Sequence, residues 1–128
     1  MRELKGVMSL IPTPMTEEAL DEEGVRALVD YCMENGCHGV GCAAAIGEGY
    51  LMPHGTWRRL VETTIDQMRG RGPVLVGCAA MGTAQAVELC REAEELGGRR
   101  RPRLQARRVR SLQRCSALQP LREHDRRR

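Results

Sequence analysis

The sequence has 128 residues, 41% of them hydrophobic, which is enough for one domain with a buried core. Its apolar N-terminal stretch is short and is broken by Pro12 and Pro14, so it fits neither a signal peptide nor a membrane span. The net charge of +3 hides a division: residues 1–98 carry eight basic and fifteen acidic side chains, a net −7, whereas residues 99–128 carry twelve Arg and two acidic side chains, a net +10. This asymmetry indicates either a basic interaction tail or a segment of different origin.

The cysteines and histidines do not follow a metal-binding pattern. No two of the six cysteines form a Cys-x-x-Cys pair, and the three histidines are scattered along the chain. We therefore expect free, buried thiols in a reduced cytoplasmic protein, with no metal, disulfide framework or organic cofactor. The cysteines are Cys32, Cys37, Cys42, Cys78, Cys90 and Cys115.

The first predicted elements are a strand and a helix. An apolar run at 7–11 ends in Pro-Thr-Pro, which is typical of a buried strand followed by a loop. Asp21 is a suitable helix N-cap, and Gly36 stands where the end of a helix requires a positive φ. The apolar face predicted between them consists of Val25, Leu28, Val29, Cys32 and Met33.

Two more pairs of elements follow. The runs 39–45 and 73–80 lack polar alternation, as expected of parallel strands that are covered on both faces. A helix between them ends at Gly-Arg-Gly, and a last helix begins with Thr83 as its cap and ends at Gly97. The predicted stripes are Trp57, Leu60, Val61, Thr64, Ile65 and Met68 in the former helix, and Ala86, Val87, Cys90, Ala93 and Glu94 in the latter.

The order of these elements predicts an α/β fold. The apolar runs recur roughly every 35 residues, the size of a βα unit, and helices alternate with them. This alternation predicts a parallel sheet. The spacing alone does not distinguish an open doubly wound sheet from a closed barrel.

The loop "AIGEGY", residues 45–50, follows the second predicted strand. Ligands of α/β proteins bind at the carboxyl ends of parallel strands, which makes this loop a candidate site. It contains neither G-x-G-x-x-G nor a P-loop, so it does not indicate a nucleotide. Taken alone, Gly47 and Gly49 fit a tight turn, and Glu48 fits the start of a helix.

Three blocks agree in order and spacing with a known family. They are "TPM" after the first strand, "GE" after the second, and G-x-x-A-x-x-T-x-x-A from Gly77 to Ala86 after the third. Over residues 5–98 the chain resembles the N-terminal third of the dihydrodipicolinate synthase / N-acetylneuraminate lyase family. The resemblance implies that the chain contains the first three βα units of a (β/α)₈ TIM barrel.

The resemblance also implies class I aldolase chemistry in the intact relative. A lysine forms a Schiff base with a 2-oxo acid such as pyruvate, and the iminium draws electrons from the bond that is made or broken. Relatives of this kind are homo-oligomers, usually tetramers of paired dimers. The resemblance places substrate binding in the loop after the second strand, which here consists of Ala45, Ile46, Gly47 and Glu48.

This loop departs from the family pattern, which reads Gly, Ser or Thr, Thr, Gly, Glu. The family's hydroxyls help to hold the carboxylate of the keto acid and relay a proton, and Ala45 and Ile46 have no hydroxyl. Backbone N–H groups around Ile46 and Gly47 remain able to hold a carboxylate. The departure leaves open which substrate the intact enzyme would use.

No residue of the chain fits the covalent role. The resemblance puts the Schiff-base lysine on the sixth strand and a helping tyrosine after the fourth. The only lysine is Lys5, before the first strand, and both tyrosines, Tyr31 and Tyr50, come too early. We expect no catalytic residue in this chain and no Schiff-base activity from it alone.

Residues 99–128 have no apolar periodicity and no aromatic residue, so we expect an irregular, disordered, Arg-rich tail. When the stretch from Gly98 is written in GC-rich codons and read one base later, it gives ADGVLVCRPAAY. This is a fourth strand followed by a Pro/Tyr loop, as in the family. We interpret the tail as an out-of-frame translation.

The alternative is a small α/β module with an Arg-rich nucleic-acid-binding arm. Aromatic residues for base stacking are missing from the tail, and residues 1–98 are acidic. We therefore do not expect nucleic acid as a partner.

Overall fold

The computed structural model describes residues 5–99 and 109–111. Within this part of the chain, no helix is both long and apolar enough to cross a membrane. The elements are β1 (Met8–Leu10), α1 (Glu22–Glu34), β2 (Gly39–Cys42), the 3₁₀ turn η1 (Ala45–Gly47), α2 (His54–Met68), β3 (Val74–Val76), α3 (Thr83–Arg99) and β4 (Val109–Ser111).

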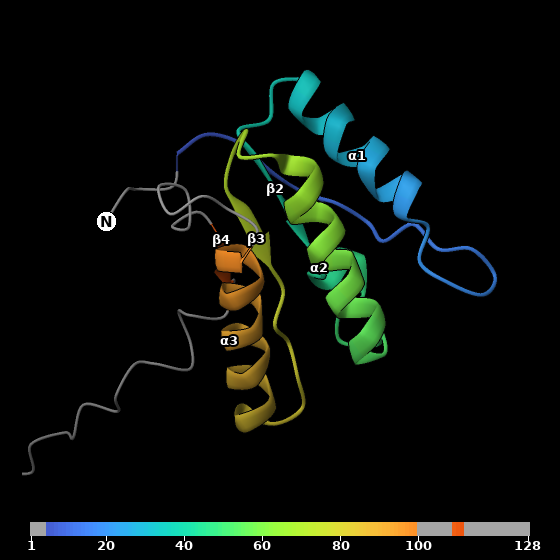
Figure 1. The fold of residues 1–128 in the computed structure, drawn as a ribbon, viewed down its shortest axis with the longest axis vertical. Helices are drawn as coiled ribbons and strands as arrows, with labels where there is room; N and C mark the ends of the chain where they lie inside the picture. The colour runs from blue at the N-terminus through green and yellow to red at the C-terminus, as the bar shows by residue number, and fades with distance from the viewer. Residues whose placement is uncertain (1–4, 100–108, 112–128) are drawn as a thin grey trace, which may run out of the picture.

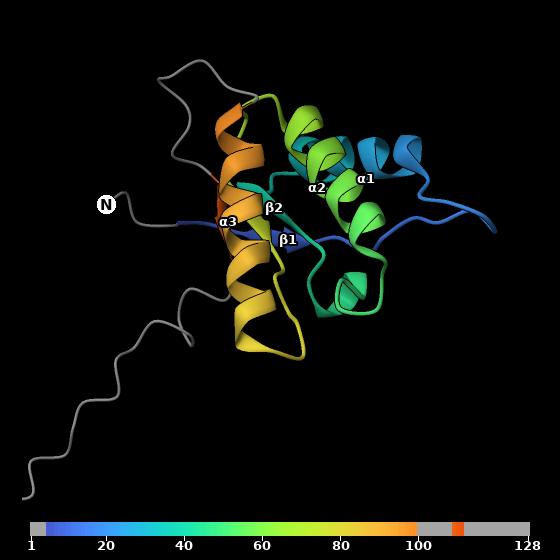
Figure 2. The ribbon, with the colours of Figure 1, turned by 60° about the horizontal axis from the view of Figure 1, so that its bottom comes forward.

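The sheet is parallel, with the strand order β1-β2-β3-β4. The three α-helices lie on one side of the sheet, as Figures 1 and 2 show, which is the arrangement expected when crossovers between neighbouring parallel strands share the usual right hand. The predicted alternation of strands and helices is confirmed. The strands are shorter than the apolar runs that predicted them, because each run continues into the loop beyond its strand.

Local signals set the ends of the first helix. The Asp21 side chain accepts a hydrogen bond of 2.9 Å from the Gly24 N–H, so Asp21 is the N-cap of α1 as predicted. At the other end, Gly36 has a φ of +89°, a conformation that glycine adopts without steric cost. The predicted start and end of this helix are therefore confirmed.

The helices bury their predicted apolar stripes to different extents. All six predicted core positions of α2 are buried, with Leu60, Val61, Thr64 and Met68 at 0% exposure. In α3, Ala93 and Leu96 are buried, whereas Glu94 is exposed, so its assignment to the stripe was wrong. The helix also runs past Gly97 to Arg99, because a glycine weakens a helix without necessarily ending it.

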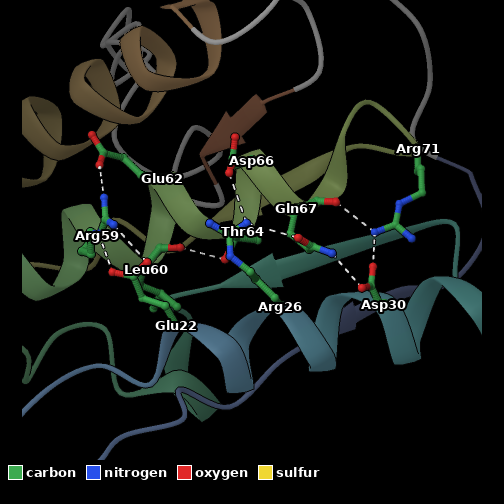
Figure 3. A network of polar contacts seen from close by, with 10 residues as sticks. All are labelled: Glu22, Arg26, Asp30, Arg59, Leu60, Glu62, Thr64, Asp66, Gln67 and Arg71. Carbon is green, nitrogen blue, oxygen red and sulfur yellow. Dashed lines mark hydrogen bonds and ion pairs between the residues drawn. The ribbon is translucent and has the colours of Figure 1, made fainter.

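A row of charged and polar side chains joins α1 to α2 (Figure 3). Arg59 donates two hydrogen bonds to the Glu22 carboxylate, and Arg26 donates 3.1 Å bonds to Asp66 and to Gln67. The hydrogen bond from Arg59 is the main reason why the pKa of Glu22 lies below its ordinary value. These contacts fix the position of α1 beside α2 without contributing to the apolar core.

A second hydrogen-bonded group closes the far end of the same row. Asp30 accepts a 2.7 Å bond from the Gln67 amide and a further bond from Arg71, which follows α2. The hydrogen bond from Arg71 is the main cause that lowers the pKa of Asp30. The row therefore runs from Glu22 to Asp30 along α1, opposite the part of the chain from Arg59 to Arg71.

The two faces of the sheet are covered differently. Val40, Cys42, Val74 and Val76 face the helices and are fully buried. On the other face, Leu10 lies over Gly41 and is 42% exposed. Gly39 and Gly41 lack the Cβ atoms that would collide with Met8 and Leu10, so these two side chains can lie across the second strand.

The strand β4 differs from the sequence-based expectation, which placed no strand in residues 99–128. Val109–Ser111 pairs in parallel with β3, joining Val74 to Val109, Leu75 to Arg110 and Val76 to Ser111. Such pairing uses backbone groups, which every residue except proline supplies, so it needs no apolar pattern in the added strand. The remainder of the predicted irregular tail, residues 100–108 and 112–128, lies outside the described residues.

Candidate functional site

The loops that follow β1, β2 and β3 meet at the carboxyl edge of the sheet. Ile11, directly after β1, donates a 2.8 Å backbone hydrogen bond to Gly41 O, and Gly77, directly after β3, donates a 2.9 Å bond to Cys42 O. The buried indole of Trp57 donates a 2.9 Å bond to Gly77 O. The first two contacts fix the outer loops against the end of β2, from which the loop with the predicted substrate-binding residues continues, and the third ties the loop after β3 to α2.

The central loop makes its turn around Ala43. Ala43 has a φ of +53° and Glu48 a φ of +51°. Positive φ values are uncommon for residues other than glycine. A Cβ atom on Gly49 or on Gly77 would lie 2.0 Å from Ala43 O. Both glycines are therefore required for the close approach of three backbone segments, which is a structural role in a tight turn.

The four predicted substrate-binding residues form one short segment at this edge. Ala45, Ile46 and Glu48 are exposed, Ile46 with 60% of its surface, whereas Gly47 is buried. The Gly47 N–H already donates a 3.0 Å hydrogen bond to Ala44 O. The segment thus exposes the residues Ala45 and Ile46, next to a glycine that is fixed in place.

Thr13 is a residue of this edge to which the sequence reading assigned no role. Its hydroxyl donates a 2.7 Å hydrogen bond to Gly47 O, across 34 residues of sequence. Thr13 comes from the Thr-Pro-Met block after the first strand, so that block was the available signal. The contact supplies a hydroxyl to a loop that has none at Ala45 and Ile46.

The other candidates from the sequence lie elsewhere. Lys5 precedes β1 and is therefore at the amino end of the strands, opposite the loop. Tyr31 is on the exposed surface of α1, with 66% of its area accessible, and Tyr50 follows η1 and is 58% exposed. The structure brings neither Lys5 nor Tyr31 to the carboxyl edge.

The cysteines of the described part are free, as predicted. Cys32, Cys42 and Cys78 are buried, and Cys37 and Cys90 are half-buried. Burial raises the pKa of the Cys42 thiol to about 12, and burial followed by the nearby Cys90 raises that of Cys78. A thiol that does not ionise near neutral pH is a poor nucleophile, so these two cysteines are core residues. Cys115 lies outside the described residues, and the described ones contain no group of three or more His, Cys, Asp or Glu that could hold a metal ion.

A shallow groove of about 370 Å³ lies between α2 and α3. Glu92 accepts a 2.6 Å bond from His54 and a 3.0 Å bond from Arg58 within it. Charges of both signs therefore face one another across the groove. Its lining residues are His54, Arg58, Glu88, Arg91, Glu92, Glu95 and Leu96, and none of the four predicted substrate-binding residues is among them.

Comparison with known proteins gives one consistent result. Residues 3–99 match the model of the dihydrodipicolinate synthetase family. The chain is 38% identical over 93 residues to the 4-hydroxy-tetrahydrodipicolinate synthase of Pelobacter propionicus, and 35% identical over 97 residues to that of Methanopyrus kandleri. These alignments cover 73% and 74% of this chain but 32% of each relative. The chain thus spans about a third of the length of the curated relatives it matches.

Solved structures give the same picture. Dihydrodipicolinate synthase from Thermotoga maritima superimposes with a TM-score of 0.68 at 33% identity, covering 72% of this chain and 31% of that one. A structure described as the first monomeric dihydrodipicolinate synthase variant superimposes with a TM-score of 0.70 at 32% identity, covering 73% and 31%. The three βα units therefore match the start of a TIM barrel, which the spacing of the sequence had left open.

Proposed function

Because the chain belongs to the dihydrodipicolinate synthetase family, we propose that it contributes the first three βα units of a class I aldolase-type lyase or synthase. The intact enzyme makes or breaks a carbon–carbon bond beside a 2-oxo acid, such as pyruvate, through a Schiff base on lysine. The observation that carries this proposal is the family match over residues 3–99, which coincides with three consecutive parallel βα units. The same proposal includes a homo-oligomeric intact enzyme in the cytoplasm. The free, mostly buried cysteines support a reducing compartment.

The segment Ala45–Glu48 is the proposed substrate loop. Since the Gly47 N–H is already donated to Ala44 O, the proposed donor to the substrate carboxylate is the backbone N–H of Ile46, the neighbouring exposed residue. Thr13, which holds Gly47 O, keeps the loop in this conformation. Thr13 is thus a positioning residue in this proposal.

The chain by itself is proposed to be inactive. Schiff-base chemistry requires a lysine whose uncharged amine reaches the keto carbon. Lys5 is the only lysine in the sequence, and it lies before β1, whereas the loop lies after β2 at the opposite end of the strands. No other side chain of this sequence forms a stable iminium with a keto acid.

The Arg-rich tail is proposed to be an out-of-frame continuation of the gene. The shifted reading from Gly98, which gives a strand and a Pro/Tyr loop, supports this interpretation. The contrast in net charge, −7 for residues 1–98 and +10 for residues 99–128, also supports it. The DNA downstream of codon 98 tests it directly. A second frame that continues into a barrel with a lysine on the sixth strand is the expected result, and stop codons in all frames would contradict it.

Borohydride trapping tests the proposed lack of activity. Pyruvate and sodium borohydride are added to the purified chain, and intact-mass spectrometry reports any reduced adduct. We expect no adduct, with the full-length Thermotoga maritima enzyme as the positive control. An adduct on a monodisperse chain that disappears in Lys5→Arg would overturn the proposal. RNA binding with a steep salt dependence, lost when the chain is stopped at Gly98, would instead favour the nucleic-acid-binding arm.

A further inference from the structure

Three of the free cysteines belong to the core between the sheet and α3. Cys42 is the last residue of β2, and Cys78 lies two residues beyond the end of β3. Both are fully buried. Cys90 lies on α3, is half-buried and packs against the same core. The three thiols therefore come from three separate segments, and the proposed substrate loop uses none of them.

The spacing of buried residues places Cys90 on the inner face of α3. Ala93 and Leu96, which follow Cys90 by three and six residues, are 0% and 3% exposed. Residues three or four apart lie on the same face of a helix, so Cys90 belongs to the face that is turned toward the core. Its partial exposure leaves it within reach of small solutes.

Cys78 and Cys90 are the two thiols of this cluster that interact most closely. A side-chain hydrogen bond joins Cys78 to Cys90, whereas Cys42 acts on Cys78 through charge alone. The Cys42 thiol is instead hydrogen-bonded to Thr64. On its other side, the Cys78 sulfur lies 3.7 Å from Val76 O. Cys78 and Cys90 thus form a pair of neighbouring free thiols from the loop after β3 and from α3.

Metal binding does not account for this cluster. Within residues 5–99 and 109–111, no group of three or more His, Cys, Asp or Glu is arranged to hold a metal ion. Two neighbouring free thiols are the starting point for a disulfide, in which the sulfur atoms approach to about 2.0 Å. The pair is therefore better suited to oxidation than to metal coordination.

We propose that Cys90 and Cys78 form a site of reversible oxidation, in which Cys90 reacts first with hydrogen peroxide and Cys78 then closes a disulfide. In the first step the Cys90 thiolate attacks a peroxide oxygen, the O–O bond breaks, and a sulfenic acid and hydroxide are formed. In the second step the Cys78 thiolate attacks the Cys90 sulfur, an S–S bond replaces the S–O bond, and hydroxide leaves. The two thiols lose two electrons and two protons, and the peroxide becomes two molecules of water.

The environments of the two thiols set the order of these steps. Peroxide reaches the half-buried Cys90 before the fully buried Cys78. Burial, followed by the nearby Cys90, raises the pKa of the Cys78 thiol, so little thiolate is present near neutral pH. Proximity offsets this low fraction, because the second step takes place within one molecule. The second step is therefore the slower one, and its rate rises with pH.

The disulfide would act on the carboxyl edge of the sheet. Cys78 directly follows Gly77, whose N–H donates to Cys42 O and whose carbonyl accepts a bond from the Trp57 indole. A bond from Cys78 to α3 therefore ties this loop to the helix and shifts the Gly77 backbone next to Ala43. The site needs neither substrate nor lysine, so it stands apart from the proposed function.

The experiment uses the full 128-residue chain after reduction and removal of the reductant. Excess hydrogen peroxide is added, the remaining thiols are alkylated, and the linked peptides are identified by mass spectrometry. We expect Cys78 joined to Cys90 within one chain as the main product, and its loss on treatment with dithiothreitol. A main product that joins other cysteines, or joins two chains, would overturn the proposal.

Variants separate the two steps. In Cys78→Ala the second step is blocked, so dimedone, which labels sulfenic acids, is expected to accumulate on Cys90. Cys90→Ala should give neither the label nor the disulfide, even if Cys78→Ala folds poorly. Cys37→Ala is the matched control, because it removes a half-buried thiol outside the cluster and should leave the disulfide unchanged. Dimedone on Cys78 in Cys90→Ala, at the level seen on Cys90, would contradict the assigned order.

The pH dependence tests the role of Cys78 as the second thiol. With peroxide in excess, the rate of disulfide formation should rise about tenfold for each pH unit above neutral, as the Cys78 thiolate fraction does. A rate that does not change with pH would overturn this role.

Trp57 reports whether the disulfide reaches the loop. It is the only tryptophan of the sequence, and its indole is bonded to Gly77 O beside Cys78. Because disulfides quench nearby indoles, its fluorescence should fall on oxidation and recover with dithiothreitol, except in Cys90→Ala. Unchanged fluorescence in a chain with the mapped disulfide would overturn the proposed effect on the carboxyl edge.

Discussion

The two faces of the sheet differ in how much of their apolar surface is buried. On the helix side, Val40 and Val74 are fully buried under α1, α2 and α3. On the opposite side, Leu10 keeps 42% of its surface exposed, whereas Leu75, in the same row of the register, keeps 9%. Burial of apolar surface contributes roughly 25 cal/mol per Å², so the helix side supplies most of the stabilisation available to this chain.

Equivalent leucine substitutions measure this difference most directly. Leu60→Ala removes a fully buried side chain of α2 and should reduce the free energy of unfolding by about 2–5 kcal/mol. Leu10→Ala removes the same atoms from the open face and should cost less than about 1 kcal/mol. Urea unfolding followed by far-ultraviolet circular dichroism gives both values. Equal losses would mean that the open face is covered in solution.

Glycine substitutions at the loop edge test the next largest effect. A Cβ on Gly77 would lie 2.0 Å from Ala43 O, so Gly77→Ala should displace the loop and destabilise the chain by about 1–3 kcal/mol. Gly55→Ala is the control, because no atom lies within 4 Å of the added Cβ and alanine favours the helix. Thermal unfolding should show a lower Tm for Gly77→Ala only. An unchanged Tm in Gly77→Ala would show that the three loops do not pack as closely as described.

The ion pairs on the outer surface of the helices should give the smallest effect. The pKa of Glu22 is lowered in the folded chain, so its contribution to stability is present above its ordinary pKa of 4.5 and is lost as the pH falls through the lowered value. Glu22→Gln should lower the Tm by about 2–4 °C at pH 7 and by less as the pH falls below 4.5. Glu34→Gln, which removes an exposed carboxylate of the same helix, is the matched control for the loss of a charge from α1. A Glu22→Gln difference that persists unchanged at low pH would rule out the ion pair as its cause.

Several elements of the fold were predictable because their signals are local. The Asp21 cap requires only residues within one turn, and the stripe from Trp57 to Met68 follows from helical spacing. The glycines of the loop were also recognisable as turn residues. The reason why glycine is required was not predictable from the sequence. Gly49 and Gly77 both approach the carbonyl oxygen of Ala43 too closely for any larger residue.

The candidate site was only partly predictable for the same reason. The loop Ala45–Glu48 was found from its place after a strand and from the family resemblance. The Thr-Pro-Met block drew attention to Thr13, but it did not indicate the partner, because the hydrogen bond from Thr13 to Gly47 joins residues 34 positions apart. The strand β4 was missed because its pairing depends on the available edge of β3 and on no property of its own side chains.

The sequence by itself determined the periodic features of this protein: three apolar runs, the helices between them, the family of residues 3–99, the single lysine, and the change of charge near Gly98. These depend on residue type and spacing along one segment. Only the tertiary structure decided which face of the sheet the helices cover, how Ala43, Gly49 and Gly77 fit together, and what lies beside β3. These features depend on atoms that are distant in sequence, and they arise when the strands pair and the helices pack on one side.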